Sequence, residues 1–409
     1  MENKRAPEIR FAGFSGEWEK LKLEELIEIS SAARVHKNEW TTSGVRFFRS
    51  SDVISNYHGT KNTPAFISYS LYEELSNKSG LVQPGDILVT GGGTIGVPYL
   101  ITDRNPLYFK DADILWLKSA NKINGYFLYF YFLTSQLQKY ISSITHIGTI
   151  SHYTITQAKD TPIILPEIVE QTKIGEFLNQ LNEFLDIQQQ ELETLKQLKQ
   201  GFLQRFFSKD LRFKDKEGSL RTERKYFKLG ELVDIYKGKS LGKKDIAQEG
   251  VNSCILYGEL FTRYKETIRS IHQKTNREEG FLTEFGDILM PTSDVTPEGL
   301  ATASCLLVDD VYVGGDIIVL RPNKEIDSVF LSYQINYFKK DIIRKVTGTS
   351  VKHIYPKDVV ELEYNIPPID EQKRIGSFLM KIDKAIALHE QELDTLKETK
   401  KAFLQKMFV

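Results

Sequence analysis

The feature that most constrains this 409-residue chain is a long segment that occurs twice. Residues 166–207 and residues 367–408 align without gaps at a constant offset of 201, and 19 of the 42 aligned positions are identical. Self-similarity at a fixed separation marks a duplicated structural unit. The repeat therefore predicts two halves that each end in the same element.

Each copy has the apolar pattern of a coiled-coil helix. Apolar side chains recur in alternating steps of four and three, which is the spacing of a coiled-coil seam. A helix of about 37 residues is roughly 55 Å long, which is too long for an ordinary globular core. We therefore expect the two matching stripes to pack against each other. The stripe residues are Ile174, Leu178, Leu181, Leu185, Leu192, Leu195, Phe202 and Phe206 in the first copy, and Ile375, Leu379, Ile382, Ile386, Leu393, Leu396, Phe403 and Met407 in the second.

Weaker echoes extend the repeat outside the helices. Gly85–Leu88 returns as Gly286–Leu289, and Asp113–Leu117 returns as Asp316–Leu320, with offsets that drift between 200 and 206. The framework is thus shared, while the loops differ. The predicted order is a globular region at 1–165, a helix at 166–208, a linker at 209–225, a second globular region at 226–365 and a second helix at 366–409.

The globular regions mix short strands with short helices. The expected helices are Leu23–Ile29 and Phe127–Tyr140. Strands and helices do not alternate regularly, which favours an α+β fold over a doubly wound α/β fold. The expected strands are Val45–Phe48, Asp86–Val89, Ile114–Leu117, Cys254–Leu256, Asp287–Met290 and Asp316–Leu320.

The composition predicts a cytoplasmic protein without a membrane anchor. No apolar run reaches the ~18 residues that a membrane span needs. The N-terminus lacks the apolar core of a signal peptide. Cys254 and Cys305 are the only cysteines, and we interpret them as buried or inert thiols rather than a disulfide or a metal pair.

A glycine-rich segment resembles a nucleotide-binding motif but lacks its context. Gly91, Gly93 and Gly96 match G-x-G-x-x-G after a predicted strand. A dinucleotide site also needs a helix to begin directly after the glycines, and an extended segment follows here. The second half has the unrelated residues 291–296 at this place. We therefore interpret the segment as a variable strand-connecting loop whose position suits a nucleic-acid contact.

Other catalytic signals are also incomplete. Asn365–Pro368 contains an Ile that breaks the N-P-P-Y element of amino-methyltransferases. Glu371–Lys373 resembles the end of a nuclease motif, but acids in the first turn of a helix are explained by the helix dipole. The sequence has no Walker loop, no H-E-x-x-H and no Cys/His cluster with metal spacing. We therefore predict that the chain is not an enzyme and holds no cofactor or metal itself.

The charge is nearly balanced in both globular regions. Residues 1–165 carry a net charge of +1 and residues 226–365 a net charge of −3. Neither has the bulk basic signature of a non-specific nucleic-acid binder. Local basic clusters occur, and they can be solvated surface or can converge on phosphates. They are Arg34, His36, Lys37, Arg46 and Arg49 in the first region, and Lys237, Lys239, Lys243, Lys244, Lys339, Lys340, Arg344, Lys345, Lys352 and His353 in the second.

The order of two divergent regions, each followed by a nearly identical helix, resembles the specificity (S) subunit of type I restriction–modification enzymes. The repeated motif P-x-x-x-E-Q-x-x-I-G-x-F-L, at Pro166–Leu178 and Pro367–Leu379, carries this resemblance. The endings Phe202–Phe207 and Phe403–Phe408 are also typical. The resemblance covers essentially the whole chain.

This resemblance implies a function in DNA recognition. In the family, each globular target recognition domain reads one half of a split DNA sequence. The two helices pair as an antiparallel coiled coil, space the domains and dock two methyltransferase subunits. Unlike domains imply an asymmetric bipartite target with a fixed gap. The expected partners are double-stranded DNA, two methyltransferase subunits and, in the full complex, restriction subunits; the partner subunits are expected to use S-adenosylmethionine, and ATP with Mg for restriction.

Candidate contact residues follow from residue type and position. Base readout favours Arg, Lys, Asn, Gln and Ser/Thr side chains in loops. The DNA-binding candidates are Arg49, Ser50, Ser51, Thr90, Gly92, Thr94, Thr149 and His152 in the first region, and Lys237, Tyr257, Thr292, Ser293, Asp294, Thr349 and Lys352 in the second. The partner-binding candidates are Glu170, Gln171, Ile174, Phe177, Glu371, Gln372, Ile375 and Phe378.

Four polar residues occupy seam positions and suggest a role in register. Gln188 and Lys199 lie in the first copy, and His389 and Lys400 lie in the second. Polar seam residues can fix the pairing of a coiled coil. Two alternative functions remain: a coiled-coil scaffold with two protein-binding heads, and a stand-alone DNA methyltransferase, which the missing catalytic motifs disfavour.

Overall fold

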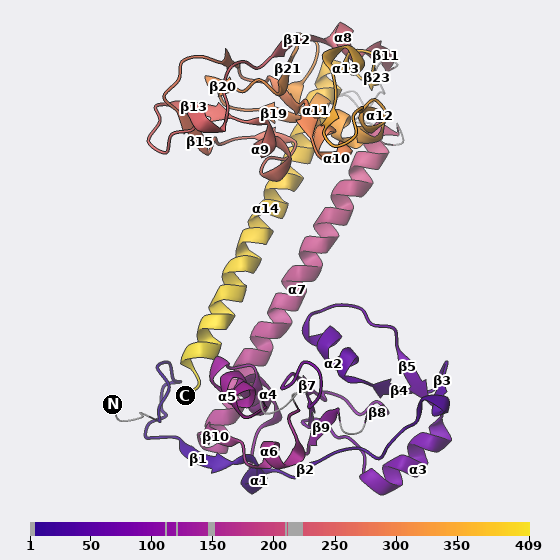
Figure 1. The fold of residues 1–409 in the computed structure, drawn as a ribbon, viewed down its shortest axis with the longest axis vertical. Coiled ribbons are helices and arrows are strands. Elements are labelled where there is room, and N and C mark those ends of the chain that lie inside the picture. Colours follow the sequence, from indigo (N-terminus) through magenta and orange to yellow (C-terminus); the bar gives the residue numbers. More distant parts are fainter. Residues whose placement is uncertain (1–4, 111–112, 120–121, 146–151, 209–210, 212–223) are drawn as a thin grey trace, which may run out of the picture. The chain divides into compact units, whose positions relative to one another are not determined.

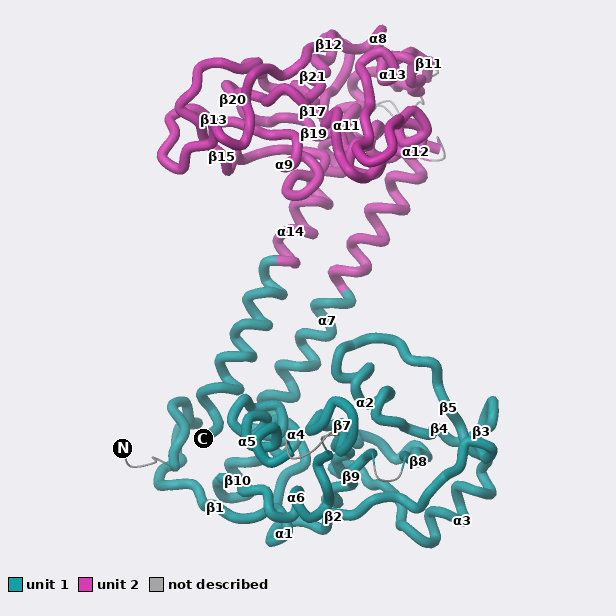
Figure 2. The backbone as a smooth tube through the Cα atoms, viewed as in Figure 1, with its two compact units in different colours: residues 1–190, 391–409 teal, residues 191–390 magenta. Residues whose placement is uncertain are grey.

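The computed structural model describes residues 5–110, 113–119, 122–145, 152–208, 211 and 224–409. The chain forms two compact units (Figure 2). Unit 1 comprises residues 1–190 and 391–409, and unit 2 comprises residues 191–390. Two long helices are labelled in Figure 1, α7 (Ile168–Phe207) and α14 (Ile369–Lys406). Each contributes a segment to both units. Among the described residues, no helix is both long and apolar enough to span a membrane.

The globular region of unit 1 contains two four-stranded sheets. The first sheet is antiparallel, and its order is β2 (Ile29–Ser30), β9 (Ile114–Leu117), β6 (Ile87–Thr90), β7 (Pro98–Leu100). The second sheet has the order β3 (Trp40–Thr41), β5 (Ala65–Ile67), β4 (Val45–Phe48), β8 (Leu107–Phe109), and β4 pairs with β8 in parallel. The helices are α1 (Leu23–Leu26), α2 (Ser50–Tyr57), α3 (Tyr69–Ser79), α4 (Gly125–Phe132), α5 (Ser135–Thr145) and α6 (Ile155–Lys159).

The globular region of unit 2 repeats this plan with more strands. One sheet has the order β12 (Val233–Lys237), β21 (Ile317–Pro322), β17 (Ile288–Pro291), β19 (Ser304–Leu306), β14 (Thr267–Ile268). The other has the order β15 (Gln273–Thr275), β13 (Asn252–Ile255), β20 (Val311–Val313), β16 (Phe281–Leu282). The helices are α8 (Leu229–Leu232), α9 (Tyr257–Thr262), α10 (Pro297–Leu300), α11 (Ser328–Tyr337), α12 (Lys339–Ile343) and α13 (Pro356–Val359). The α+β prediction is confirmed.

A two-stranded antiparallel ribbon lies before each long helix. In unit 1 it pairs β1 (Glu19–Lys22) with β10 (Pro162–Leu165), and in unit 2 it pairs β11 (Lys225–Lys228) with β23 (Glu363–Ile366). Each ribbon joins the beginning of its globular region to the strand that leads into α7 or α14. Each long helix therefore starts directly after the strand that pairs the end of its globular region with the beginning of that region.

One predicted helix is wrong in its extent. The segment Phe127–Tyr140 forms two helices, α4 and α5, rather than one. At the break, the Thr134 hydroxyl donates to the Tyr131 carbonyl at 2.7 Å, and the same oxygen accepts from the Leu137 amide at 3.4 Å. A threonine side chain that bonds nearby backbone competes with a continuous helix and starts a new one. The predicted helix at Leu23–Ile29 is also shorter, because it ends at Leu26.

The two long helices pack antiparallel within each unit. In unit 2 the contacts Lys196–Glu390, Lys199–Asp383 and Phe202–Phe378 pair rising α7 numbers with falling α14 numbers. In unit 1 the rings of Phe177 and Phe403 lie 5.0 Å apart. The apolar seam positions predicted on both helices are all buried or half-buried, as a coiled coil requires. The prediction of a helix pair is confirmed.

The last turn of each long helix enters a globular core. Phe408 lies 5.2 Å from Phe127 in unit 1, and Phe207 lies 5.7 Å from Phe330 in unit 2, measured between ring centroids. Phe207 and Phe408 are equivalent positions of the repeat. Buried aromatic pairs contribute roughly 1 kcal/mol beyond their area. The repeated Phe-rich endings are therefore core residues of the domains that they enter.

Candidate nucleic-acid interface

In unit 1, several candidate residues gather at one end of the β2-β9-β6-β7 sheet. The Gly91 amide donates to the Asp113 carbonyl, and the Tyr153 amide donates to the Gly91 carbonyl, both at 2.8 Å. Gly92 forms a backbone bridge with His152. The Ser50 hydroxyl donates to the Asp113 carbonyl at 3.1 Å. The segment after β6, the residue before β9 and the segment around His152 therefore meet at the start of α2.

Two candidates in this group have structural roles. Thr90 is fully buried, and its hydroxyl donates to the Thr94 carbonyl at 2.5 Å and accepts from the Val97 amide at 3.0 Å. Gly92 is buried, and a Cβ added there would lie 3.0 Å from Asp113 Oδ1. The base-contact assignment of these two residues is corrected: they shape the loop. Ser51, Thr94 and His152 are exposed and stay predictions.

The guanidinium group of Arg49 forms hydrogen bonds within the domain. Its Nε donates to Asp52 Oδ2 at 2.7 Å, and its Nη2 donates to the Thr63 carbonyl at 2.6 Å. Asp52 is buried and also forms an ion pair with Arg46, whose Nη2 lies 3.6 Å from Asp52 Oδ1. Because Arg49 uses these donors internally, it positions the start of α2 in the described structure. Thr149 lies outside the described residues.

Unit 2 builds the same arrangement with different side chains. The Thr292 amide donates to the Asp316 carbonyl at 2.9 Å, and the Ile354 amide donates to the Thr292 carbonyl at 3.1 Å. Ser293 pairs with His353 across the short strands β18 (Ser293–Asp294) and β22 (Lys352–His353). The Ser293 hydroxyl lies 3.0 Å from His353 Nδ1. Ser293 thus takes the place of Gly92, and His353 takes that of His152.

The remaining candidates of unit 2 flank this point. Lys237 is exposed at the end of β12 and pairs in register with Ile318 of β21. On the other side of β21, Ile318 pairs with Met290, which lies two residues before Thr292. Thr349 is exposed. The Lys352 ammonium donates to the Gly348 carbonyl at 2.8 Å. Thr292 is buried, so its base-contact assignment is corrected to a backbone role.

A cavity of about 620 Å³ opens beside this group. Its lining includes Tyr257 at the start of α9, Asp294 and Asp316. Glu259 also lines it, and burial raises the pKa of the Glu259 carboxyl. Asp294 Oδ2 accepts from the Thr296 hydroxyl at 2.6 Å. Sequence reasoning missed the pivotal residues Asp113 and Asp316, although both open the repeated strand segment.

The repeated E-Q-x-x-I-G motif joins each long helix to its domain. Gln171 Oε1 accepts from the Asn124 amide at 3.0 Å, and Gln372 Oε1 accepts from the Asp327 amide at 2.8 Å. Asn124 and Asp327 cap the N-termini of α4 and α11. Each cap residue therefore has two roles. Its backbone amide donates to a glutamine of the long helix, and its side chain caps the neighbouring helix.

The acid of the same motif forms a partly buried ion pair in each unit. Arg10 donates to both carboxylate oxygens of Glu170 at 2.7 Å. Arg224 donates to Glu371 Oε1 at 2.6 Å. Hydrogen bonding to Glu170 raises the pKa of Arg10, although burial opposes it. Bidentate charge-assisted bonds of this kind are among the stronger hydrogen bonds.

The partner-binding candidates therefore have internal roles in the described structure. Glu170, Gln171, Ile174, Glu371, Gln372 and Ile375 are all buried. Phe177 contacts Phe403, and Phe378 contacts Phe202. The assignment of these six buried residues to a partner surface is corrected, because their side chains hold each helix to its domain. Phe177 and Phe378 are half-buried, and their assignment stays a prediction.

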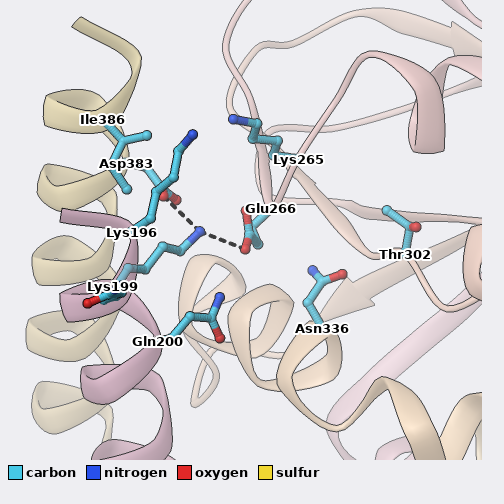
Figure 3. A pocket seen from close by; sticks show the side chains of 10 residues that line it. Lys196, Lys199, Gln200, Lys265, Glu266, Thr302, Asn336, Asp383 and Ile386 are labelled. Atoms are coloured by element: carbon cyan, nitrogen blue, oxygen red, sulfur yellow. Dashed lines mark hydrogen bonds and ion pairs between the residues drawn. The ribbon is translucent and has the colours of Figure 1, made fainter. Parts of the chain in front are cut away.

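The polar seam position Lys199 forms an ion triad (Figure 3). Its ammonium lies 2.7 Å from Asp383 Oδ1 and 2.8 Å from Glu266 Oε1. The Tyr333 hydroxyl also donates to Asp383. Burial lowers the pKa of Lys199, but the charges of Glu266 and Asp383 outweigh it, so the pKa is raised overall.

The described residues offer no group of His, Cys, Asp and Glu side chains that could hold a metal ion. Cys254 and Cys305 are free and buried, as predicted. Burial raises the pKa of the Cys254 thiol to about 11 and that of the Cys305 thiol to about 12. Both thiols are therefore protonated at neutral pH.

Known proteins share this sequence pattern and fold. A family model described as the type I restriction modification DNA specificity domain matches residues 15–197 and again residues 222–398. The type I restriction enzyme MjaVIII specificity subunit of Methanocaldococcus jannaschii is 22% identical over 82% of this chain and 81% of its own length. The putative type I restriction enzyme MjaX specificity subunit of the same organism is 25% identical over 78% and 76%.

A solved structure supports the fold. The type I restriction-modification system S subunit from M. genitalium superposes with a TM-score of 0.65, at 19% sequence identity and with 99% of each chain covered. The two matches of the family model fall on the two halves that the repeat separates, and together they cover most of the chain. The chain therefore belongs to the type I restriction–modification DNA specificity family.

Proposed function

We propose that this chain is the DNA-specificity subunit of a type I restriction–modification system and that each globular region reads one half of an asymmetric bipartite target. One observation carries this proposal: both units bring the same three segments together at a sheet end but present different side chains there. Thr94 and His152 occupy this end in unit 1, whereas Ser293, Asp294 and His353 occupy it in unit 2. A shared scaffold with unlike side chains suits two unlike half-sites.

The paired helices give the proposed target its gap. α7 and α14 are continuous over 40 and 38 residues, and each contributes to both units. Helices of this kind are suited to act as a spacer, because a coiled coil resists bending and slippage of register. Two DNA readers on a fixed spacer imply half-sites at a set separation, as in dimeric DNA-binding proteins.

Methyltransferase subunits are the proposed partners along the helices. Exposed apolar side chains occur on both helices outside the seam: Phe184 is 45% exposed and Ile187 is 51% exposed on α7, and Leu388 is 53% exposed on α14. Leu388 is the repeat equivalent of Ile187, which suits two similar docking sites for two copies of one subunit. Exposed apolar residues on a polar helix face favour protein contact. The methyltransferase subunits would use S-adenosylmethionine, and restriction subunits in the full complex would use ATP with Mg.

The proposal is tested by expressing the chain with its neighbouring methyltransferase in a host that lacks DNA methylation and mapping methylated bases genome-wide. The expected result is methylation at a single motif made of two specified blocks and a constant unspecified gap. The methyltransferase expressed alone is the control and should give no such motif. Methylation without sequence dependence, or at a continuous motif, would contradict the proposal.

A further inference from the structure

Each unit has a pocket where the end of one long helix faces the other helix and the globular region. The pocket of unit 2 is about 630 Å³ in volume, and that of unit 1 is about 520 Å³. The two pockets are repeat equivalents. Their lining residues correspond at the offset of 201 as Lys196 and Lys397, Lys199 and Lys400, Gln200 and Lys401, Asn182 and Asp383, and Leu185 and Ile386.

The pocket of unit 2 is neutralised by its own carboxylates. Lys199 contacts Asp383 and Glu266, as Figure 3 shows, and Lys196 lies 2.9 Å from Glu390 Oε1. Lys265 lies 3.7 Å from the other oxygen of Glu390. Each lysine of this pocket therefore has an acidic partner within the unit.

The pocket of unit 1 lacks these carboxylates. Asn182 replaces Asp383, and residues 57–59 at the C-terminal end of α2 line the pocket where Lys265 and Glu266 line the other. Three lysines line it, namely Lys397, Lys400 and Lys401, together with His58. Asp186 is the carboxylate in the lining.

The lysines of the unit 1 pocket are weakly compensated. Among the described residues, Lys397 and Lys400 form no ion pair within 4.0 Å, and Lys401 has Glu398 at 3.7 Å with both side chains largely exposed. Lys400 is half-buried in the helix seam beside Leu393 and Leu404. An ammonium in such a place is costly unless an anion accompanies it.

The geometry points to this pocket as a binding site for a phosphate group of the DNA backbone, an inference that rests on the proposed function. Lysines bind phosphate as point charges, and three of them converge here from one face of α14. A phosphate would supply the negative charge that Asp383 and Glu266 supply in unit 2. The site therefore belongs to one half of the chain only.

The position of α2 favours DNA over an acidic protein segment as the occupant. Tyr57, at the C-terminal end of α2, lines the pocket, and the candidate DNA contacts Ser50 and Ser51 lie at its N-terminal end. Eight residues of helix span about 12 Å. That length corresponds to roughly three to four base pairs at about 3.4 Å each. A duplex that is read at the start of α2 and runs alongside this helix would have backbone phosphates within reach of the pocket.

The test compares salt dependence of DNA affinity for the chain assembled with its methyltransferase subunits. A random-sequence duplex and a duplex with the mapped motif are titrated over a range of salt concentrations. The variant Lys397→Gln with Lys401→Gln, both exposed, should reduce the slope of log affinity against log salt by about 1 on both duplexes, as expected for the loss of one phosphate contact. The methylated motif should not change. Lys381→Gln with Lys384→Gln, two exposed lysines elsewhere on α14, is the charge-matched control and should keep the slope.

A second variant tests the site without removing a lysine. Asn182→Asp installs the carboxylate of unit 2 beside Lys400, and it should also lower DNA affinity and the salt slope. An unchanged slope in both variants would overturn the inference, as would a slope that falls equally in the control. If the variants lose the methyltransferase subunits while the salt slope is unchanged, the occupant of the pocket is a protein. If the chain binds inorganic phosphate while the salt slope of the variants is unchanged, the pocket is a site for a free anion. Either result would overturn the inference of a DNA phosphate site. If the wild-type assembly methylates without a motif, the proposed function fails instead.

Discussion

Lys199 on α7 and Asp383 on α14 form an ion pair of 2.7 Å in unit 2. Glu266 from the globular region binds the same ammonium at 2.8 Å. One side chain therefore joins both helices and the domain. Its repeat equivalent, Lys400, lies in the same kind of seam position without this pair of carboxylates. The two lysines thus provide a natural comparison of a paired and an unpaired buried charge.

Lys199→Met should lower the free energy of unfolding by about 3 kcal/mol, because it removes the cation that Asp383 and Glu266 share and leaves Asp383 with its bond from the Tyr333 hydroxyl. Chemical unfolding of the chain measures this change. The raised pKa of Lys199 means that its stabilisation is fully present below the ordinary lysine pKa of 10.5 and is lost as pH rises through the raised value.

Lys400→Met is the matched control for that experiment. Burial lowers the pKa of Lys400, and Asp186 only partly opposes this, so the charged side chain is destabilising. The substitution should be neutral or should stabilise the fold by about 1 kcal/mol. Equal destabilisation by both variants would show that the ion triad contributes nothing specific.

Gly175→Ala should destabilise unit 1 by about 2 kcal/mol through overpacking. A Cβ at Gly175 would lie 2.8 Å from Asn124 Oδ1 and 2.8 Å from the Phe127 amide. Gly201 lies on the same helix, and a Cβ added there would have no neighbouring atom within 4 Å, so Gly201→Ala should stabilise the helix by about 1 kcal/mol. Thermal unfolding distinguishes the two, and similar effects at both sites would refute close packing at Gly175.

The repeat made the frame predictable, but not the use of each residue in it. Periodic apolar positions specify a buried seam wherever it packs, so the helix pair followed from spacing. The repetition of Glu170 and Gln171 indicates that both copies need these side chains, but it does not say what they bind. In the structure they bind residues of the same unit: Arg10 donates to Glu170, and the Asn124 amide donates to Gln171. Arg10 is 160 residues away, so local patterns could not reveal the pairing. Thr90 likewise has the residue type and position of a surface loop contact, but it is buried, and its hydroxyl bonds Thr94 and Val97 within the folded loop.

Neither cysteine should react with a thiol reagent in the native protein near pH 8. With pKa values of about 11 and 12 for Cys254 and Cys305, about one thiol in a thousand or fewer is ionised at that pH. Titration with a chromogenic disulfide should count no thiol before unfolding and both after it. Rapid reaction of the folded chain would show that the thiols are accessible.

His152→Ala should alter methylation in one half of the target only. His152 is exposed at the sheet end of unit 1, and the equivalent His353→Ala should affect the other half. Loss of one good base contact costs about 1–3 kcal/mol, which corresponds to a relaxation of roughly fivefold to 150-fold at one position. Methylome mapping with each variant measures this. A change in both blocks from either variant would contradict separate reading.

A domain exchange tests whether each globular region reads one half-site. Residues 226–365 are replaced with the corresponding region of another family member, and methylated bases are mapped genome-wide for the parent and the chimera. We expect one block of the motif to change and the other block to be retained. A motif in which both blocks change would contradict it.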